Sequence, residues 1–252
     1  MSIPELSKSQ IDKLGSRLRK GDINEDDLRL LDSYRRLFTA AYEEVVGRIR
    51  NELGLEPTGR PAKSTTSISE KLRRESIRLS QIQDIAGCRI IVADILTQDE
   101  VVGRLSQLFV GSIVVDRRER PSNGYRAVHV IVAHSGKLIE VQVRTALQHL
   151  WAELSEKLSD VVDNAIKYGG GDEQVVTILR IMSDNINVQE VGESELLRTL
   201  SENRQDKSVE ELDQENTKRQ DILKQKFAIV TALNAIGEVL PRLKGKKNVI
   251  SD

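Results

Sequence analysis

The stretch that most limits the possible folds of this chain is a predicted β-hairpin over residues 123–144. Two runs of alternating apolar and polar residues flank Ser135-Gly136, a dipeptide typical of a tight turn between antiparallel strands. A two-residue turn there places only β-branched side chains on one face, as a packed sheet requires. Those side chains are Val128, Val130, Val132, Ile139, Val141 and Val143. The chain is therefore expected to contain a sheet with a buried face.

The opposite face of this hairpin carries chemically versatile groups where a solvated strand usually carries Lys, Thr and Ser. In the same register, His129 lies opposite Gln142 and Ile131 lies opposite Glu140. Tyr125 and Arg144 extend the same face. An ordinary polar surface with cross-strand pairs is the alternative that the hairpin alone leaves open.

The remaining pattern predicts helices around a small sheet. Helices are expected over 5–20, 26–53, 67–79 and 97–109, from residue 145 onward and over 208–240, with strands over 88–93 and 112–115. Capping boxes at Ser67-x-x-Glu70 and Thr97-x-x-Glu100 and a cap at Thr145-x-x-Gln148 mark three helix starts. The Gly- and Pro-rich residues 54–62 predict a loop, and the three glycines at 169–171 predict a flexible joint. This order indicates an α/β (α+β) fold with a mixed, mostly antiparallel sheet flanked by helices.

Composition narrows the classes of protein that fit. The 252 residues carry a net charge of only −1, which argues against a protein that holds DNA through overall charge. The absence of an apolar run near 18 residues and of a secretory start predicts a cytoplasmic protein without a membrane span. The single cysteine, Cys88, lies in an apolar run and is expected to fill the core. Three histidines without ligand spacing make a zinc site or a His-Asp hydrolase site a poor fit.

A second carboxylate and a group of cations complete the candidate site. Asp84 precedes the predicted strand 88–93, and together with Glu140 on a neighbouring strand it has the chemistry to hold one Mg²⁺. The loop 59–67 runs into a predicted helix N-terminus, which favours phosphate binding without a Walker A pattern. The nearby cations are Arg60, Lys63, Lys71, Arg73, Arg74, Arg78, Arg89 and Arg144. This combination predicts phosphoryl-type transfer on a nucleotide.

Four motifs in chain order resemble the synthetase domain of the RelA/SpoT family, over about residues 40–160. They are Arg60-x-x-Lys63-x-x-x-Ser67-Ile-x-x-Lys71-Leu, Asp84-Ile-Ala-Gly-Cys-Arg89-Ile, Asn123-Gly-Tyr-Arg-Ala-Val-His129 and Glu140-Val-Gln-Val-Arg-Thr145. The resemblance implies a nucleotidyltransferase-like fold. It also implies transfer of the β,γ-pyrophosphate of ATP to the ribose 3′-OH of GDP or GTP, which makes the stringent-response alarmone (p)ppGpp. The implied organisation is a helical N-terminal extension (1–25), the synthetase domain (26–168) and a helical C-terminal region (172–252).

The resemblance also implies roles for individual residues. Asp84 and Glu140 would hold Mg²⁺, and Glu140 would accept the proton of the attacking 3′-OH. The ATP side would consist of two arginines stacked on the adenine and three phosphate-binding side chains: Arg60, Arg89, Lys63, Ser67 and Lys71. The acceptor side would consist of a ring stacked on the base and three polar side chains: Tyr125, His129, Gln142 and Arg144.

Several alternatives stay open at the level of sequence. The first motif has one residue more than the usual Arg-x-Lys spacing, and the residues before Asn123 differ from the common pattern but keep Arg117, Arg118 and Arg120. The resemblance extends to small stand-alone synthetases, among them toxins that modify the 3′-CCA end of tRNA or adenosine nucleotides and are neutralised by an antitoxin protein. A non-catalytic nucleotide-binding module is a third reading. The C-terminal helices are candidates for a homo-oligomer contact.

Overall fold

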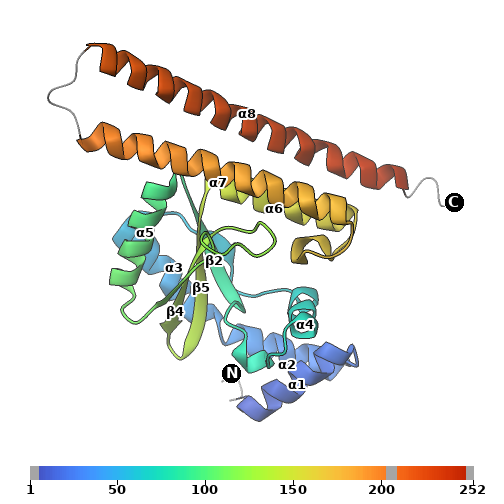
Figure 1. The fold of residues 1–252 in the computed structure, drawn as a ribbon. Coiled ribbons are helices and arrows are strands. Elements are labelled where there is room, and N and C mark those ends of the chain that lie inside the picture. Colours follow the sequence, from blue (N-terminus) through green and yellow to red (C-terminus); the bar gives the residue numbers. More distant parts are fainter. Residues whose placement is uncertain (1–5, 203–208, 248–252) are drawn as a thin grey trace. The chain divides into compact units, whose positions relative to one another are not determined.

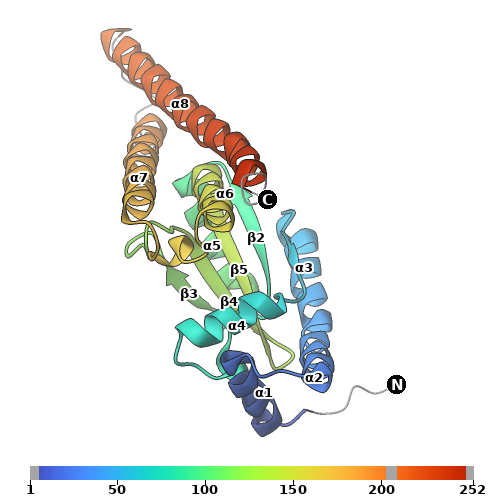
Figure 2. The same ribbon diagram turned by 90° about the vertical axis from the view of Figure 1, so that its right-hand side faces the viewer.

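The computed structural model describes residues 6–202 and 209–247, and its elements are drawn in Figures 1 and 2. Contacts divide the chain into two compact units. The first consists of Met1–Ile90, Val102–Val115 and His129–Val143, and the second of Ile91–Val101, Asp116–Val128 and Arg144–Asp252. The sheet belongs to the first unit except for the terminal residues of four of its strands.

The first elements in chain order are helices and a five-stranded mixed sheet in the order β1-β2-β5-β4-β3. The helices are α1 (Lys8–Lys20), α2 (Glu25–Arg36), α3 (Thr39–Leu53), α4 (Thr65–Arg74), the short η1 (Leu79–Gln81) and α5 (Ile95–Leu108). The strands are β1 (Thr58–Arg60), β2 (Ala86–Val92), β3 (Ile113–Asp116), β4 (Val128–His134) and β5 (Lys137–Thr145). This architecture confirms the predicted α+β class.

The predicted hairpin is present as β4 and β5. Ser135 and Gly136 have φ angles of 48° and 70°, the left-handed values that a two-residue type I′ turn requires. All six β-branched side chains of the apolar face are at most 1% exposed, which confirms that this face is buried. Ile131, expected on the other face, is buried as well.

The prediction that residues 54–62 form only a loop is wrong, because they contain β1. This strand pairs antiparallel with β2, with Gly59 opposite Cys88. A Cβ at Gly59 would lie 2.4 Å from the carbonyl oxygen of Gly87, so the close approach of the two strands needs glycine there. All three residues of β1 are exposed, so no hydrophobic alternation marks the strand in the sequence.

The helix predicted over 26–53 is in fact two helices, α2 and α3. The N–H groups of Leu37 and Phe38 bond back to the carbonyls of Tyr34 and Arg35, which ends α2 in a tight turn. The apolar spacing continues across this break, since the buried rings of Tyr34 and Phe38 pack edge to face with centroids 5.3 Å apart. Periodicity alone therefore did not reveal the interruption.

The N-caps of two helices lie three residues earlier than predicted. The hydroxyl of Ser64, not Ser67, caps α4 and accepts the N–H of Ser67 at 3.2 Å. The carboxylate of Asp94, not the side chain of Thr97, accepts the N–H of Thr97 at 2.8 Å at the start of α5. Helix α4 also ends at Arg74, before the predicted residue 79. In both helices a second capping-type residue precedes the predicted one by three positions.

The second unit is built mainly from helices α6 (Ala146–Val161), α7 (Glu173–Glu202) and α8 (Val209–Lys247), with the short η2 (Ile166–Tyr168). Thr145 caps α6 in a capping box with Gln148, as predicted. The core of the unit contains Leu147, Trp151, Leu154, Ile166, Leu179, Ile186, Leu233 and Leu240. Within the described residues, no helix is both long enough and apolar enough to cross a membrane.

Helices α7 and α8 are joined by side-chain contacts and run along each other in Figure 1. The amide of Gln189 donates to the carbonyl of Ile222 at 2.8 Å, and Lys226 pairs with Glu193 at 2.7 Å. The longest helix is α8, as predicted, although its predicted first residue, Ser208, lies outside the described residues. The expected glycine joint is tightly packed, because a Cβ at Gly169 would lie 2.2 Å from the Asn123 side chain.

Candidate functional site

A cluster of charged side chains in the first unit surrounds Asp84, just before β2. Lys63, in the loop after β1, reaches one carboxylate oxygen at 2.6 Å. Lys71, from α4, reaches the other oxygen at 2.8 Å. The loop is held in place because the N–H of Lys63 bonds to the carbonyl of Ile85 at 2.7 Å. The structure thus brings together three residues that the sequence assigns to one site.

The two lysines determine the charge of Asp84. Burial opposes the ionised form, but the attraction and hydrogen bonds of Lys63 and Lys71 outweigh it and lower the pKa of Asp84 from 3.8 to about 2. Asp84 is therefore a carboxylate at every physiological pH. Its two oxygens and the two ammonium groups alternate in charge, the arrangement needed to bind both cations and phosphates.

A second carboxylate, Glu140, lies in the middle of β5. Nδ1 of His129 on β4 donates to Oε1 of Glu140 at 2.8 Å, and the Gln142 amide donates to Oε2 at 2.6 Å. Burial raises the pKa of Glu140 and the charge of Asp84 raises it further, but these hydrogen bonds and the charge of His129 lower it by more. Gly87 leaves room beside Glu140, since a Cβ there would lie 2.7 Å from the Glu140 carbonyl oxygen. The carboxylate is thus oriented and charged.

The donor chemistry of Asp84 and Glu140 fits Mg²⁺. Both are oxygen ligands with a lowered pKa, so they stay ionised at neutral pH, and the charge of Asp84 acts on Glu140. Over the described part of the chain, no group of three or more His, Cys, Asp or Glu side chains is arranged to hold a metal ion. An ion at these two carboxylates would therefore take its remaining ligands from substrate phosphates and water, the usual pattern for Mg²⁺.

The expected ATP-side arginines lie on neighbouring strands. Arg60 of β1 pairs with Gly87 of β2, and Thr58 pairs with Arg89. Arg60 and Arg89 are therefore diagonal neighbours on the same face of the sheet, about 7–8 Å apart at Cα by the usual geometry of such pairs. Two planar guanidinium groups at this spacing have the geometry to stack on the two faces of one flat ring.

Ser67 lies in the first turn of α4, on the same helix face as Lys71, four residues later. Its N–H and its hydroxyl both contact Oγ of Ser64, at 3.2 Å and 2.8 Å. The buried Ile68 and Leu72 anchor the other side of the helix. The N-terminal end of α4 thus points backbone N–H groups and a hydroxyl in the direction favourable for anions.

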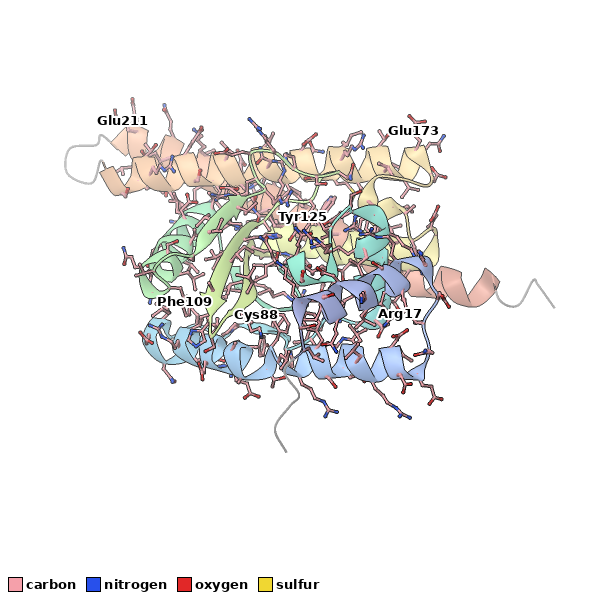
Figure 3. All side chains as sticks on the ribbon, turned by 90° about the horizontal axis from the view of Figure 1, so that it is seen from below. Arg17, Cys88, Phe109, Tyr125, Glu173 and Glu211 are labelled. Carbon is pink, nitrogen blue, oxygen red and sulfur yellow. The ribbon has the colours of Figure 1, made fainter. Side chains whose placement is uncertain are left out.

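Two predicted acceptor residues, Tyr125 and Arg144, belong to the second unit. The Arg144 guanidinium donates to the Tyr125 hydroxyl at 3.0 Å and lies 5.1 Å from the centre of the ring. Arg144 is buried, and Tyr125, labelled in Figure 3, packs at the edge of the core of this unit.

Cys88, also labelled in Figure 3, is buried in the first unit, and burial raises the pKa of its thiol to about 12. It fills the core, as predicted.

The arginine-rich loop before Asn123 is less basic than its sequence suggests. Arg118 forms ion pairs with Asp116 at 2.6 Å and Asp99 at 2.8 Å, and it also bonds to Gln98. Its charge is therefore balanced inside the second unit. Arg118, one of the three arginines of this loop, is thus paired with two carboxylates.

Sequence reasoning missed a buried polar network in the second unit. Glu190 of α7 accepts hydrogen bonds from Thr145 and from Gln148, the latter at 3.0 Å, and burial raises the pKa of its carboxyl. Gln148 in turn accepts from Gln98 at 2.9 Å. These residues are 42–50 positions apart, so no local pattern connects them.

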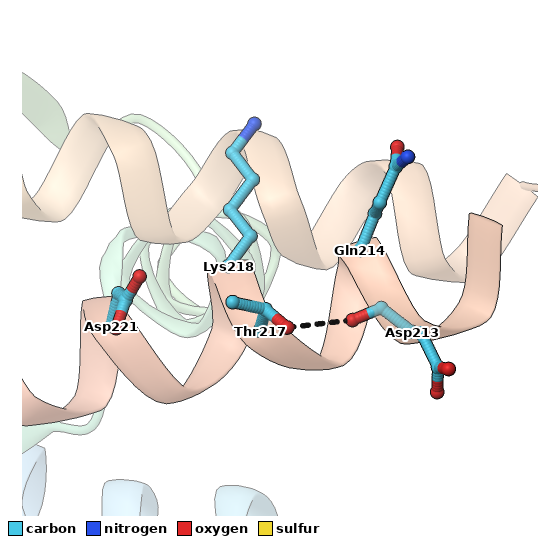
Figure 4. Close-up of a pocket in the computed structure, with 5 residues that line it drawn as sticks. All are labelled: Asp213, Gln214, Thr217, Lys218 and Asp221. Atoms are coloured by element: carbon cyan, nitrogen blue, oxygen red, sulfur yellow. Dashed lines mark hydrogen bonds between the residues drawn. The ribbon is translucent and has the colours of Figure 1, made fainter. Parts of the chain in front are cut away.

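The pocket drawn in Figure 4 is separate in sequence from the candidate site. It lies along one helix, α8, where the Thr217 hydroxyl bonds back to the Asp213 carbonyl at 2.8 Å. Its other lining residues are Gln214, Lys218 and Asp221. None of the residues predicted for the site lines it.

A helix-flanked mixed sheet that carries a carboxylate bonded to two lysines and a second, hydrogen-bonded carboxylate suits a nucleotide-handling class of protein, and comparison with known proteins points to the same class. Residues 59–159 match the model described as the region found in RelA / SpoT proteins, so the chain contains this region. The uncharacterized protein Rv1366 of Mycobacterium tuberculosis is 32% identical over 182 residues, 69% of this chain and 66% of that protein. The GTP pyrophosphokinase YjbM of Bacillus subtilis is 36% identical over 117 residues, 40% of this chain and 54% of that protein.

The fold is similar to that of a solved small alarmone synthetase. The crystal structure of the small alarmone synthetase 1 from Bacillus subtilis is 27% identical, with a TM-score of 0.52. The similarity covers 71% of this chain and 100% of that chain. The matches thus extend over just under two thirds of the mycobacterial relative and about half of YjbM.

Proposed function

We propose that this protein is a Mg²⁺-dependent pyrophosphokinase that transfers the β,γ-pyrophosphate of ATP to the 3′-OH of GDP or GTP, making (p)ppGpp. The observation that carries the proposal is the Lys63–Asp84–Lys71 cluster within the RelA/SpoT region. The hydrogen-bonded Glu140 in the same unit supplies the second carboxylate. YjbM and small alarmone synthetase 1 are named for this class of activity, which supports the proposal.

In this proposal Glu140 takes the proton. The 3′ oxygen of the acceptor forms a bond to the β-phosphorus of ATP, the bond between that phosphorus and the α,β-bridging oxygen breaks, and AMP leaves. The hydroxyl proton passes to the Glu140 carboxylate, whose orientation is maintained by His129 and Gln142. A lowered pKa keeps Glu140 unprotonated, and thus able to accept the proton, at neutral pH.

Lys63 and Lys71 neutralise the phosphates of ATP. In the structure their ammonium groups bind Asp84, so incoming phosphate oxygens compete with this carboxylate for the same donors. Ser67, on the same face of α4 as Lys71, adds a hydroxyl at the helix N-terminus. Asp84 and Glu140 would hold Mg²⁺, which would supply further neutralisation of the phosphate charge. Arg60 and Arg89 hold the adenine between them.

The acceptor is held by Tyr125 stacked on its base, with Arg144 bonded to the Tyr125 hydroxyl. His129 and Gln142 also belong to the acceptor and metal side, because both bond to the Glu140 carboxylate. Stacking on one ring contributes about 1–3 kcal/mol and tolerates different bases. GDP and GTP carry the same guanine base, so the choice between them is expected to depend on phosphate contacts and not on the ring.

The test is product analysis with purified protein, ATP and Mg²⁺, offering GDP, GTP, AMP and deacylated tRNA one at a time. The proposal predicts AMP release equal to the amount of a guanosine product that gains two phosphates at its 3′ oxygen. Product on the 3′ end of tRNA alone would instead assign the toxin chemistry. ATP binding without any transfer would assign a nucleotide-binding module and contradict the proposal.

A further inference from the structure

Helix α7 contacts the residues on both sides of Tyr125 in the second unit. The hydroxyl of Ser183, which is 2% exposed, donates to the carbonyl of Gly124 at 2.5 Å. The same hydroxyl accepts from Nε of Arg126 at 3.1 Å. One buried side chain of α7 thus bonds to the residue before Tyr125 and to the residue after it.

Two further α7 side chains bond to the same loop, residues 123–126. Arg126 donates to the Asp184 carboxylate at 2.9 Å, and Arg180 donates to the Asn123 side chain at 3.0 Å. Positions 180, 183 and 184 are three and four residues apart, so they form one face of the helix. This face bonds to Asn123, Gly124 and Arg126, three of the four residues of the 123–126 loop.

Packing restricts the loop as strongly as these bonds do. Gly124 has a φ of 88°, and a Cβ there would lie 2.7 Å from the Trp151 ring and 3.2 Å from Cβ of Ser183. The Trp151 indole N–H donates to the α7 carbonyl of Leu179 at 2.8 Å. Gly124 is therefore enclosed between Trp151 and α7, and the backbone has little freedom to turn Tyr125 in another direction.

We propose that Arg180, Ser183 and Asp184 are positioning residues that set acceptor affinity by holding the 123–126 loop in the conformation that presents Tyr125. They act through the loop and do not touch the substrate. Helix α7 lies outside the RelA/SpoT region of residues 59–159, so the C-terminal part of the chain contributes to acceptor binding. The role in acceptor binding rests on the proposed function, whereas the anchoring of the loop does not.

The experiment compares full-length wild-type protein with Ser183→Ala, Asp184→Ala and Asp184→Asn. Glu195→Ala is the matched control, because Glu195 is an exposed carboxylate of the same helix. Hydrogen exchange of the peptide containing residues 122–127 reports on the loop without any substrate. Steady-state kinetics then give KM for GDP and for ATP. Asp184 is 70% exposed in its ion pair, so its variants are expected to fold.

We expect faster exchange of this peptide in Ser183→Ala and Asp184→Ala, and wild-type exchange in Glu195→Ala. Loss of a buried hydrogen bond predicts that KM for GDP rises about tenfold in Ser183→Ala, while KM for ATP stays unchanged. Asp184→Asn keeps an acceptor oxygen for Arg126, so its exchange rate and its KM for GDP should lie between those of wild type and Asp184→Ala.

Equal exchange in all variants would overturn the inference, whether or not the protein is active. Faster exchange with an unchanged KM for GDP, or with equal changes for GDP and ATP, would overturn it too. A wild-type protein that transfers to no acceptor would contradict the proposed function, and the exchange rates would still decide whether α7 anchors the loop.

Discussion

Nδ1 of His129 lies 2.8 Å from Oε1 of Glu140, and this hydrogen bond joins the neighbouring strands β4 and β5. Gln142, two residues after Glu140 on β5, donates to the second oxygen at 2.6 Å. The carboxylate is thereby oriented from both sides and kept ionised. An oriented, ionised carboxylate is what a general base requires, so the effect of each of its partners on turnover can be predicted.

Replacing His129 with alanine should lower kcat more than it raises either KM. The loss of one hydrogen bond to a charged group predicts a decrease of about 10- to 100-fold. His134→Ala is the matched control, because His134 lies on the same strand and pairs with a different carboxylate, Glu44. Steady-state kinetics of both variants check this, and equal losses of kcat would show that the His129–Glu140 bond has no special role.

The ring and the hydroxyl of Tyr125 can be separated by two substitutions. Tyr125→Ala removes stacking and should weaken GDP binding by about 1–3 kcal/mol. Tyr125→Phe keeps the ring and loses the bond from Arg144 to the hydroxyl, so a change of about 1 kcal/mol or less is expected. Calorimetric titration of GDP measures both. Unchanged binding in Tyr125→Ala would rule out the stacking role.

Removing the ammonium group of Lys71 should weaken ATP binding. Charge-assisted contacts contribute about 1.5–3 kcal/mol, so KM for ATP is expected to rise about 10- to 100-fold in Lys71→Ala. Lys13→Ala, at an exposed position of α1, is the matched control and should match wild type. A KM for ATP that is unaffected in Lys71→Ala, measured at saturating acceptor, would contradict the phosphate-binding role.

The Asp84 cluster predicts a specific dependence of stability on pH. The pKa of Asp84 is about 2 in the folded protein and 3.8 ordinarily, so the unfolded chain takes up the proton first as the pH falls. The resulting stabilisation of about 2 kcal/mol is complete above pH 4 and is lost as the pH falls to about 2.

Denaturant unfolding of wild type and Asp84→Asn between pH 7 and pH 2.5 measures this contribution. The free energies of unfolding should differ most at neutral pH and converge in acid. A difference that stays constant over this range would mean that the two lysines do not lower the pKa of Asp84.

The parts of the fold that follow from local patterns were predictable from sequence. The β4–β5 hairpin combines a period of two with a turn dipeptide, and Thr145 starts α6 with a complete capping box. The start of α4 was misplaced by three residues, because Ser64 and Ser67 both suit a helix cap and only the bonded geometry distinguishes them. Strand β1 was missed because it forms through its pairing with β2 and carries no hydrophobic pattern of its own.

In the same way, some contacts of the candidate site and its surroundings were predictable from sequence and others were not. Its motif residues Lys63, Lys71 and Asp84 were expected together and do contact one another. The bonds that Ser183 and Glu190 make with residues 42–59 positions away were not predictable. These α7 residues carry no motif, and only the folded chain shows which loop each one reaches.

The most direct test of the central claim is transfer of label from γ-labelled ATP to GDP or GTP in the presence of Mg²⁺, with wild type and Glu140→Gln side by side. Loss of a general base predicts that Glu140→Gln is slower by about 10²- to 10⁴-fold while it still binds ATP. Label on GDP or GTP with wild type, lost in Glu140→Gln, is the predicted result. Equal transfer by the two proteins, or no labelled guanosine nucleotide with wild type, would contradict it.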